Sequence, residues 1–375
     1  MTDIVDSVNE VDPVSGMRPA PRAHRSHNPQ SPLARIATIS AVLLPMLGCS
    51  APTTRSPQYP AASISTMAPA SEPPVSSDLP GQARQIVLDG LADPHPQVRA
   101  NAIEVVASTR EFRLMPKVQG LMADKVVPVR FAAILAVGDL AYTPAKNDIT
   151  ALLNDPNPNI KIAACYAMSR LGQPECYKDI CTAVASSDQT VRANAALLLG
   201  KSGQKEGIRF LYWALQRDDS SEMVVLQTAE AIAMLGDQRI YRKLLATLIS
   251  AYADDRVIGI RAMGALGTDE ARSSIVTMLD DPVPEVRLAA AEQLGKLGDS
   301  GGEAEVLAIF DKKLPAGMSA QEQERVKTLA ALAIGEVGTE RSAKHLPLLL
   351  QDSAKIVRLA AAKAVLRRDL KRHRP

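Results

Sequence analysis

Residues 281–298 read DPVPEVRLAAAEQLGKLG and contain the signals for one complete helix. Asp281 is a residue type that caps helix N-termini, and Pro284 suits a first turn whose amide groups have no helical partner. Gly298 stands where a left-handed residue ends many helices. Between them runs an apolar series at helical spacing: Val286, Ala290, Leu294 and Leu297. We therefore predict a helix that is capped at Asp281 and ends at Gly298.

The same pattern recurs along the chain. We take the residue at the position of Arg287 as the index residue of each copy. Subtracting successive positions gives a spacing of 31 residues at six of the eight steps, with 33 and 40 at the other two. A short apolar segment after each copy, such as 304–310, predicts a second, antiparallel helix. A fixed spacing of this kind indicates an array of helical repeats. The index residues are Arg99, Arg130, Lys161, Arg192, Val225, Arg256, Arg287, Lys327 and Arg358.

Glycines follow the index residues at constant offsets of eight or eleven residues. They are Gly138, Gly172, Gly200, Gly203, Gly236, Gly264, Gly267, Gly295, Gly298, Gly335 and Gly338.

The pattern Asp-Pro-x-Pro-x-Val-Arg-x-Ala-Ala, followed by Leu-Gly and a second helix, resembles the short bacterial HEAT repeat, also described as the phycobilisome-lyase HEAT-like repeat. Residues 93–102, 124–133, 155–164, 281–290 and 352–361 carry it best. The copy at 223–236 lacks the basic residue, and the copy around Lys327 lacks the Asp-Pro opening. The resemblance implies an all-α, right-handed α-solenoid of about nine helix-pair repeats. It does not imply one function, because such folds serve many tasks.

Composition fits a helical array. Hydrophobic residues make up 46% of the chain and aromatic residues only 3%, so small apolar side chains dominate. The formal net charge is +2, which gives no gross electrostatic case for binding nucleic acid or an anionic membrane surface.

The N-terminal region has the features of an export signal. Basic residues up to Arg35 precede the apolar run 36–47, which is too short to span a bilayer, and Gly48-Cys49 follows it. The ending resembles a bacterial lipoprotein signal, in which the cysteine is lipidated. We therefore expect residues 1–48 to be an N-terminal extension and signal peptide, with Cys49 as the lipidation site. An ordinary cleaved signal is the alternative, and Met17 is an alternative start.

Residues 49–80 are rich in Pro, Ser and Ala and nearly uncharged, which predicts a disordered tether. Residues 81–375 then form the predicted solenoid, with 81–91 as a capping helix and a basic C-terminal end. This organisation places the protein in the bacterial cell envelope, lipid-anchored, with the outer membrane facing the periplasm as the expected location.

One acidic and one basic residue recur in most repeats, six residues apart. A row of basic residues along a solenoid is one way to bind phosphate. HEAT arrays, however, contain a structural Asp–Arg ladder, and we assign this role to the row. Its members are Asp93, Arg99, Asp124, Arg130, Asp155, Lys161, Asp281, Arg287, Asp352 and Arg358.

A second row lies on the predicted second helices, seventeen residues after the index residues. The resemblance implies that second helices line the concave side, and Trp, Tyr and Arg dominate binding hot spots. The alternative is that the aromatic rings pack between repeats and the basic residues are only solvated. The candidate partner-binding residues are Lys178, Arg209, Tyr212, Trp213, Tyr241, Arg242 and Lys344.

Cysteine and histidine residues give no sign of a metal site or cofactor. Cys176 and Cys181 lack Cys-x-x-Cys spacing, and Cys165 fits a buried apolar position. A disulfide from Cys165 to either of the other two stays open. The sequence has no His-Glu dipeptide, P-loop or Gly-x-Ser-x-Gly elbow, so we predict no catalytic residues and no enzyme.

The sequence leaves three functions open. The leading one is a non-enzymatic, membrane-tethered scaffold or adaptor that binds another protein through the concave face. The second is a bilin lyase or maturation factor of the phycobilisome-lyase type, which an export signal contradicts. The third is a HEAT-like nucleic-acid-binding protein, which a homogeneously basic concave face would favour.

Overall fold

The computed structural model describes residues 78–312 and 315–373. These form α-helices joined by loops and short 3-10 turns, with no strand among them. The predicted all-α repeat array is therefore confirmed. No helix in the described part of the chain is both long and apolar enough to cross a membrane. The predicted signal peptide, Cys49 and nearly all of the predicted tether lie outside the described residues, and the first helix starts at Leu79.

Each repeat consists of a long first helix and a shorter second helix. The first helices are α3 (Pro96–Thr109), α5 (Val127–Asp139), α7 (Pro158–Arg170), α9 (Gln189–Ser202), α11 (Glu222–Met234), α13 (Ala253–Leu266), α15 (Pro284–Lys296), α17 (Ala320–Val337) and α20 (Lys355–Arg372). The second helices are α4 (Met115–Gly120), α6 (Lys146–Leu152), α8 (Tyr177–Ala183), α10 (Ile208–Gln216), α12 (Tyr241–Leu248), α14 (Asp269–Thr277), α16 (Glu303–Asp311) and the pair α18 (Glu340–Ala343) and α19 (Leu346–Leu350).

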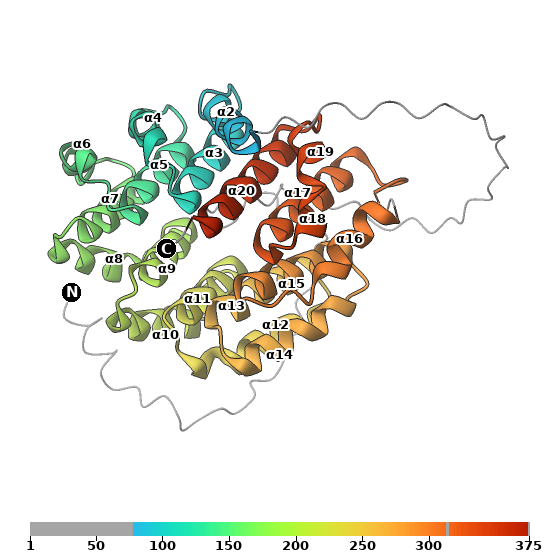
Figure 1. Cartoon of the computed structure of the whole chain (residues 1–375). Helices are drawn as coiled ribbons and strands as arrows, with labels where there is room; N and C mark the ends of the chain where they lie inside the picture. The colour runs from blue at the N-terminus through green and yellow to red at the C-terminus, as the bar shows by residue number, and fades with distance from the viewer. Residues whose placement is uncertain (1–77, 313–314, 374–375) are drawn as a thin grey trace, which may run out of the picture.

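The array closes into a ring. Figure 1 shows the last helix, α20, lying beside α2 (Leu79–Leu91) and α3 at the start of the described chain. In the other repeats, a second helix packs between its own first helix and the first helix of the next repeat. Helix α2 takes this position between α20 and α3. The predicted cap at 81–91 is therefore corrected: α2 supplies the second helix of a ninth repeat whose first helix is α20.

Small residues determine which layer lies inside the ring. First helices contact their neighbours directly from α3 around to α20. A Cβ added at Gly200 of α9 would lie 2.8 Å from the Cα of Ala231 in α11, so only glycine permits this approach. Gly335 of α17 meets Ala364 of α20 in the same way. Because the first helices approach so closely, they form the layer of smaller radius and the second helices lie outside.

The Asp–Arg ladder joins neighbouring repeats. The guanidinium of Arg99 lies 2.8 Å from the carboxylate of Asp124, and Arg256 lies 2.8 Å from Asp281 in the same arrangement. The Arg99 Nη1 atom also donates to the carbonyl of Asp93, six residues earlier. Burial alone raises the pKa of Asp124, but Arg99 and a backbone amide outweigh burial and hold it below its usual value. These carboxylates neutralise Arg99 and Arg256 and join neighbouring repeats.

The ladder is incomplete in several repeats. Arg130 donates to the carbonyl of Asp124, and no ion pair is described for it or for Lys161. Arg287 pairs with Glu305 at 2.7 Å, since the next repeat, around Lys327, has no aspartate at the ladder position. At the ring closure Lys355, rather than Arg358, reaches Asp93 at 2.6 Å.

The predicted helix of residues 281–298 is correct in extent, with one correction at its start. Helix α15 begins at Pro284 and its N-cap is Val283. Asp281 lies two residues earlier, where its carboxylate accepts from the Val283 amide at 2.8 Å. The aspartate therefore fixes the turn before the helix and is free to pair with Arg256. Gly298 has the predicted left-handed conformation, with φ of +81°.

We predict that the ring closure holds α2 in place. Leu359 of α20 is 1% exposed, and its Cδ2 atom would lie 3.1 Å from a Cβ at Gly90 of α2. Leu359→Ala should cost about 2–5 kcal/mol, as buried leucine truncations do. Hydrogen exchange measured by mass spectrometry should show that α2 loses protection.

The control is Leu288→Ala, which removes an equally buried leucine from the same repeat position in α15. It should leave α2 protected. Equal exchange of α2 in the two variants would contradict the split repeat.

Candidate functional site

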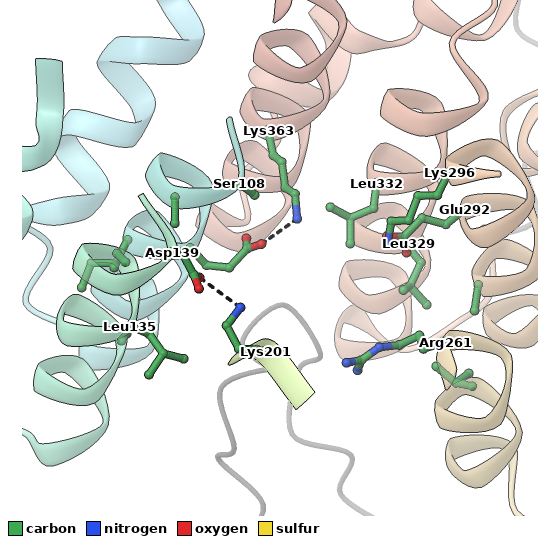
Figure 2. Close-up of a pocket in the computed structure, with 17 residues that line it drawn as sticks. Ser108, Leu135, Asp139, Lys201, Arg261, Glu292, Lys296, Leu329, Leu332 and Lys363 are labelled. Atoms are coloured by element: carbon green, nitrogen blue, oxygen red, sulfur yellow. Dashed lines mark hydrogen bonds and ion pairs between the residues drawn. The ribbon is translucent and has the colours of Figure 1, made fainter. Parts of the chain in front are cut away.

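A cavity of about 350 Å³ lies at the centre of the ring. Seven first helices supply its walls, and no described second helix contributes to them. The lining residues are Ile103, Glu104, Ala107, Ser108, Ala132, Leu135, Ala136, Asp139, Lys201, Val257, Arg261, Ala289, Glu292, Lys296, Leu329, Leu332 and Lys363. Figure 2 shows Lys363, Lys201 and Arg261 reaching toward this space from different helices.

The expectation that second helices line the inner face is wrong. The physical reason is the close approach of the Ala- and Gly-rich first helices, which places them at the smaller radius. The predicted partner-binding residues therefore lie on the outer side of the ring or at its edges, away from the cavity.

Charges of both signs line the cavity in pairs. The Nζ atom of Lys363 lies 2.8 Å from Glu104, which joins α20 to α3 across the ring closure. Lys201 of α9 lies 3.0 Å from Asp139 of α5. Lys296 pairs with Glu292 at 2.6 Å one turn earlier on α15. The fourth cation, Arg261, pairs at 2.9 Å with Glu230 of α11.

Nearby opposite charges keep Lys363 and Glu292 ionised despite their burial. Burial lowers the pKa of Lys363, but nearby carboxylates, led by Glu104 and Glu292, outweigh it and the net shift is upward. Burial raises the pKa of Glu292, but Lys296 and Lys363 outweigh it and the net shift is downward. The inner wall is therefore a set of opposed charges rather than a field of one sign.

Apolar side chains fill the wall between the charges. Leu135, Leu329 and Leu332 line the cavity with a row of alanines, and Ser108 is the only hydroxyl among the lining residues. The Ser108 Oγ donates to the carbonyl of Val105 at 3.3 Å in its own helix. Among the described residues, no group of three or more His, Cys, Asp and Glu side chains is arranged to hold a metal ion. The arrangement is suited to electrostatic contact rather than to nucleophilic chemistry.

The predicted candidates on the second helices divide into two kinds. Their basic members, Lys178, Arg209, Arg242 and Lys344, are exposed. Their aromatic members are partly buried against the core. Trp213 lies under the guanidinium of Arg217 at 5.2 Å from the ring centre, and Tyr212 has the same contact with Arg239 at 5.0 Å. The hydroxyl of Tyr241 lies 2.9 Å from the Ser274 Oγ. The structure brings Arg209, Tyr212 and Trp213 together on α10 and Tyr241 with Arg242 on α12, while Lys178 and Lys344 lie on other repeats.

The three described cysteines are free thiols. Cys165 is 1% exposed, as expected of a buried apolar position. Its Sγ atom lies 3.7 Å from the Asp179 carboxylate, and burial followed by that charge raises the pKa of Cys165 to about 12.

Sequence reasoning missed the charges of the cavity. Four of them, together with the Arg261 partner Glu230, occupy one repeat position, five residues after the index residue, where other repeats have Leu or Tyr. They are Glu104, Glu230, Arg261, Glu292 and Lys363. A charged residue in the middle of an Ala- and Leu-rich helix is the signal that could have identified the inner face. It was hidden because the first helices were expected to lie outside.

We predict that Lys363 stabilises the ring by neutralising buried carboxylates. Its side chain is 17% exposed, so Lys363→Met should cost about 3 kcal/mol at neutral pH, as the loss of one partner of a buried pair does. The folded-state pKa of Glu292 is depressed, so its stabilising effect is present above the unfolded-state value near 4.3 and is lost as pH falls through the folded value. Urea unfolding should therefore show a smaller difference between wild type and variant near pH 3.

Lys296→Met is the matched control. Its side chain is 40% exposed and its pair lies within one helix, so the cost should be below about 1 kcal/mol. Similar costs for the two variants would contradict the role given to Lys363.

Comparisons with known proteins agree with this architecture. The family model for HEAT repeats matches residues 177–257 and 241–314. No curated protein sequence matches the chain. Among solved structures, 116 chains match.

Three of these structures illustrate the range. The complex of CpcE and CpcF of phycocyanin lyase from Nostoc sp. PCC7120 is 16% identical, covering 67% of this chain and 99% of that chain with a TM-score of 0.41. Human deoxyhypusine hydroxylase is 16% identical, with 71% and 98% covered and a TM-score of 0.35. Kap121p is 14% identical, with 78% and 37% covered and a TM-score of 0.31. At such identities the likeness concerns the fold alone: the described chain is an all-α solenoid that contains HEAT repeats.

Proposed function

We propose that the protein is a non-enzymatic scaffold, tethered to the bacterial envelope by a lipid on Cys49, that binds another protein through the outer surface of the ring. The observation that carries this proposal is the distribution of exposed apolar side chains. Six large ones are exposed among the described residues, and four of them lie within residues 245–276: Leu245, Ile249, Tyr252 and Val276. We name Leu245, Ile249 and Tyr252 the outer patch.

The outer patch is compact in sequence and strongly exposed. Leu245 and Ile249 lie one helical turn apart at the end of α12, with 43% and 84% of their surface exposed. Tyr252, 66% exposed, follows in the loop before α13. The neighbouring Arg242 and Lys243 are exposed as well. Apolar and aromatic residues with a basic border are the composition of a protein-binding surface.

Ring closure favours the outer surface over the interior as the place where a folded partner binds. An open solenoid wraps a partner along its concave face, but here that face encloses only about 350 Å³. This volume suits a small molecule or a few side chains, not a folded domain. The exposed basic candidates Arg209 and Arg242 already lie on outer helices, so they remain part of the proposed surface.

The alternatives have less support. The cavity walls carry paired charges of both signs, whereas nucleic-acid binding needs a net basic surface. The proposed lipid tether is incompatible with a role in a cytosolic phycobilisome, which disfavours a bilin lyase or its maturation factor. The absence of a cofactor and of catalytic residues is part of the proposal.

The outer patch is tested by site-specific crosslinking in the native bacterium. A photo-reactive amino acid in place of Ile249 or Tyr252 should give a discrete crosslinked protein, since both side chains lie in the proposed interface. The triple variant Arg242→Gln, Leu245→Ser, Tyr252→Ser, with the photo-reactive residue at Ile249, should lose that product and keep its helical circular dichroism.

The control is the same residue at Leu348, which is 68% exposed on α19. It should give no such product. Crosslinks of equal yield at Leu348 and Ile249, or none at Ile249 and Tyr252, would remove the outer patch from consideration.

The lipid tether is tested separately by metabolic labelling with a clickable fatty acid. Wild type should carry the label and fractionate with membranes, because Cys49 is the proposed lipidation site. Cys49→Ser should lose the label. An unlabelled wild-type protein in the cytosol would refute the tether and restore the bilin and nucleic-acid alternatives.

A further inference from the structure

A second hollow, of about 430 Å³, lies at the ring closure. It is lined by Arg84 of α2 and by the loop between α3 and α4: Arg110, Glu111, Phe112 and Arg113. We name Arg110, Phe112 and Arg113 the rim cluster. These residues bring two arginines and one aromatic ring to the surface within four positions of the chain.

The rim cluster is exposed and its arginines are unpaired. Arg84 is occupied, at 3.2 Å from Glu111 and 3.2 Å from Asp369. Arg110 and Arg113 are exposed, and no side-chain hydrogen bond or ion pair is described for either. Phe112 is 50% exposed between them. Lys117, one helical turn beyond Arg113 on α4, is exposed too. The surface therefore combines uncompensated positive charge with an accessible apolar ring.

The rim cluster lies at the edge of the ring from which the described chain starts. The Arg84 contacts connect the α3–α4 loop to the first half of α2 and to the end of α20. Residue 78, the first described, is only six residues before Arg84. Cys49 precedes residue 78 by 29 positions, and the proposed tether of that length would span roughly 30 Å on average as a flexible chain. A ring tethered at Cys49 thus keeps this edge close to the membrane.

We propose that the rim cluster binds the phosphate groups of an anionic lipid surface, with Phe112 inserted at the level of the headgroups. This inference rests on the proposed tether for its location. Arginine forks match phosphate oxygens, and aromatic rings are stable at the membrane interface. The two unpaired guanidiniums are complementary in charge to anionic headgroups. The half-exposed ring of Phe112 is stabilised when it is buried on the apolar side of the membrane interface. A free phosphate would use the arginines but leave Phe112 without a role.

The number of cationic residues in the rim cluster sets the expected loss of vesicle affinity. Near an anionic leaflet each Lys or Arg contributes about 1 kcal/mol, and the contribution decays within a Debye length. Loss of Arg110 and Arg113 together with Phe112 should therefore weaken vesicle binding by at least about tenfold, and added salt should weaken the wild type but not the variant.

The variants are chosen so that the fold is retained. Arg110 has a φ of +58° at the repeat position where later repeats place Gly172, Gly203 or Gly236, all with positive φ. Arg110→Gly therefore removes the charge and relieves the backbone. Phe112→Ser and Arg113→Gln complete the rim variant, since both side chains are exposed. The matched control is Lys125→Gln, Arg272→Gln and Leu348→Ser, which removes two exposed cations and one exposed apolar side chain outside both the rim cluster and the outer patch.

The experiment uses the full chain with Cys49→Ser, so that no lipid is attached and residues 1–77 are common to all samples. Co-sedimentation is measured with vesicles of phosphatidylcholine alone and of phosphatidylcholine mixed with phosphatidylglycerol. The control variant should bind the anionic vesicles as the parent does, and the rim variant should bind them at least about tenfold more weakly. Equal binding by the rim variant and its parent would overturn the proposal.

Two further comparisons are needed. One distinguishes lipid phosphate from free phosphate, and the other separates the rim-cluster proposal from the lipid-tether proposal. Inorganic phosphate at the same concentration as lipid phosphate should not displace the parent protein; full displacement would identify a free-phosphate site and overturn the lipid assignment. If Cys49 takes no fatty acid but the rim variant still loses vesicle binding, the tether is wrong and the rim cluster stands. If Cys49 is labelled and vesicle binding is unchanged, the rim cluster is wrong and the tether stands.

Discussion

The packing of α20 against α2 and α3 determines the form of the molecule. These helices lie at opposite ends of the described chain, yet they build one repeat and bury Leu359 and Ala102 at 1% and 0% exposure. Ion pairs such as Lys355–Asp93 and Lys363–Glu104 span the same junction. Every repeat then has a neighbour on both sides. No repeat of the described chain is therefore left with an uncovered stacking face. Terminal repeats of an open array need polar caps, and closure removes that need.

Closure also divides the surface by chemistry. The first helices meet around a narrow cavity, where their charged side chains pair within one helix or between nearby helices. Such pairs contribute specificity of arrangement more than net stability, since desolvation offsets much of their attraction. The second helices face outward, and they carry the exposed side chains that a partner can reach. The proposed recognition surfaces therefore lie on the outer face and at the edges rather than on the inner face that open solenoids use.

Much of this architecture follows from the sequence, and the remainder has identifiable physical causes. The helix of 281–298, the spacing of the repeats and the Asp–Arg ladder are local or nearest-neighbour features, so residue patterns predict them. Closure depends on the summed rotation of all repeats, which no single repeat encodes. The inner position of the first helices followed from glycines such as Gly200 and Gly335, whose role as contact points is visible only beside Ala231 and Ala364. The charges of the cavity were missed for the same reason.

The two proposed surfaces occupy opposite parts of the ring, and this follows from the connectivity. Loops from a first to a second helix, such as 110–114, lie at the edge where first helices end. Loops from a second to the next first helix, such as 249–252, lie at the edge where first helices begin. The outer patch belongs to the fifth helix pair from α3, and the rim cluster adjoins the ninth, which is half a ring away. In the proposed arrangement, a ring that rests on a membrane through Arg110, Phe112 and Arg113 therefore presents Ile249 and Tyr252 away from that membrane, where the proposed protein partner would have access to them.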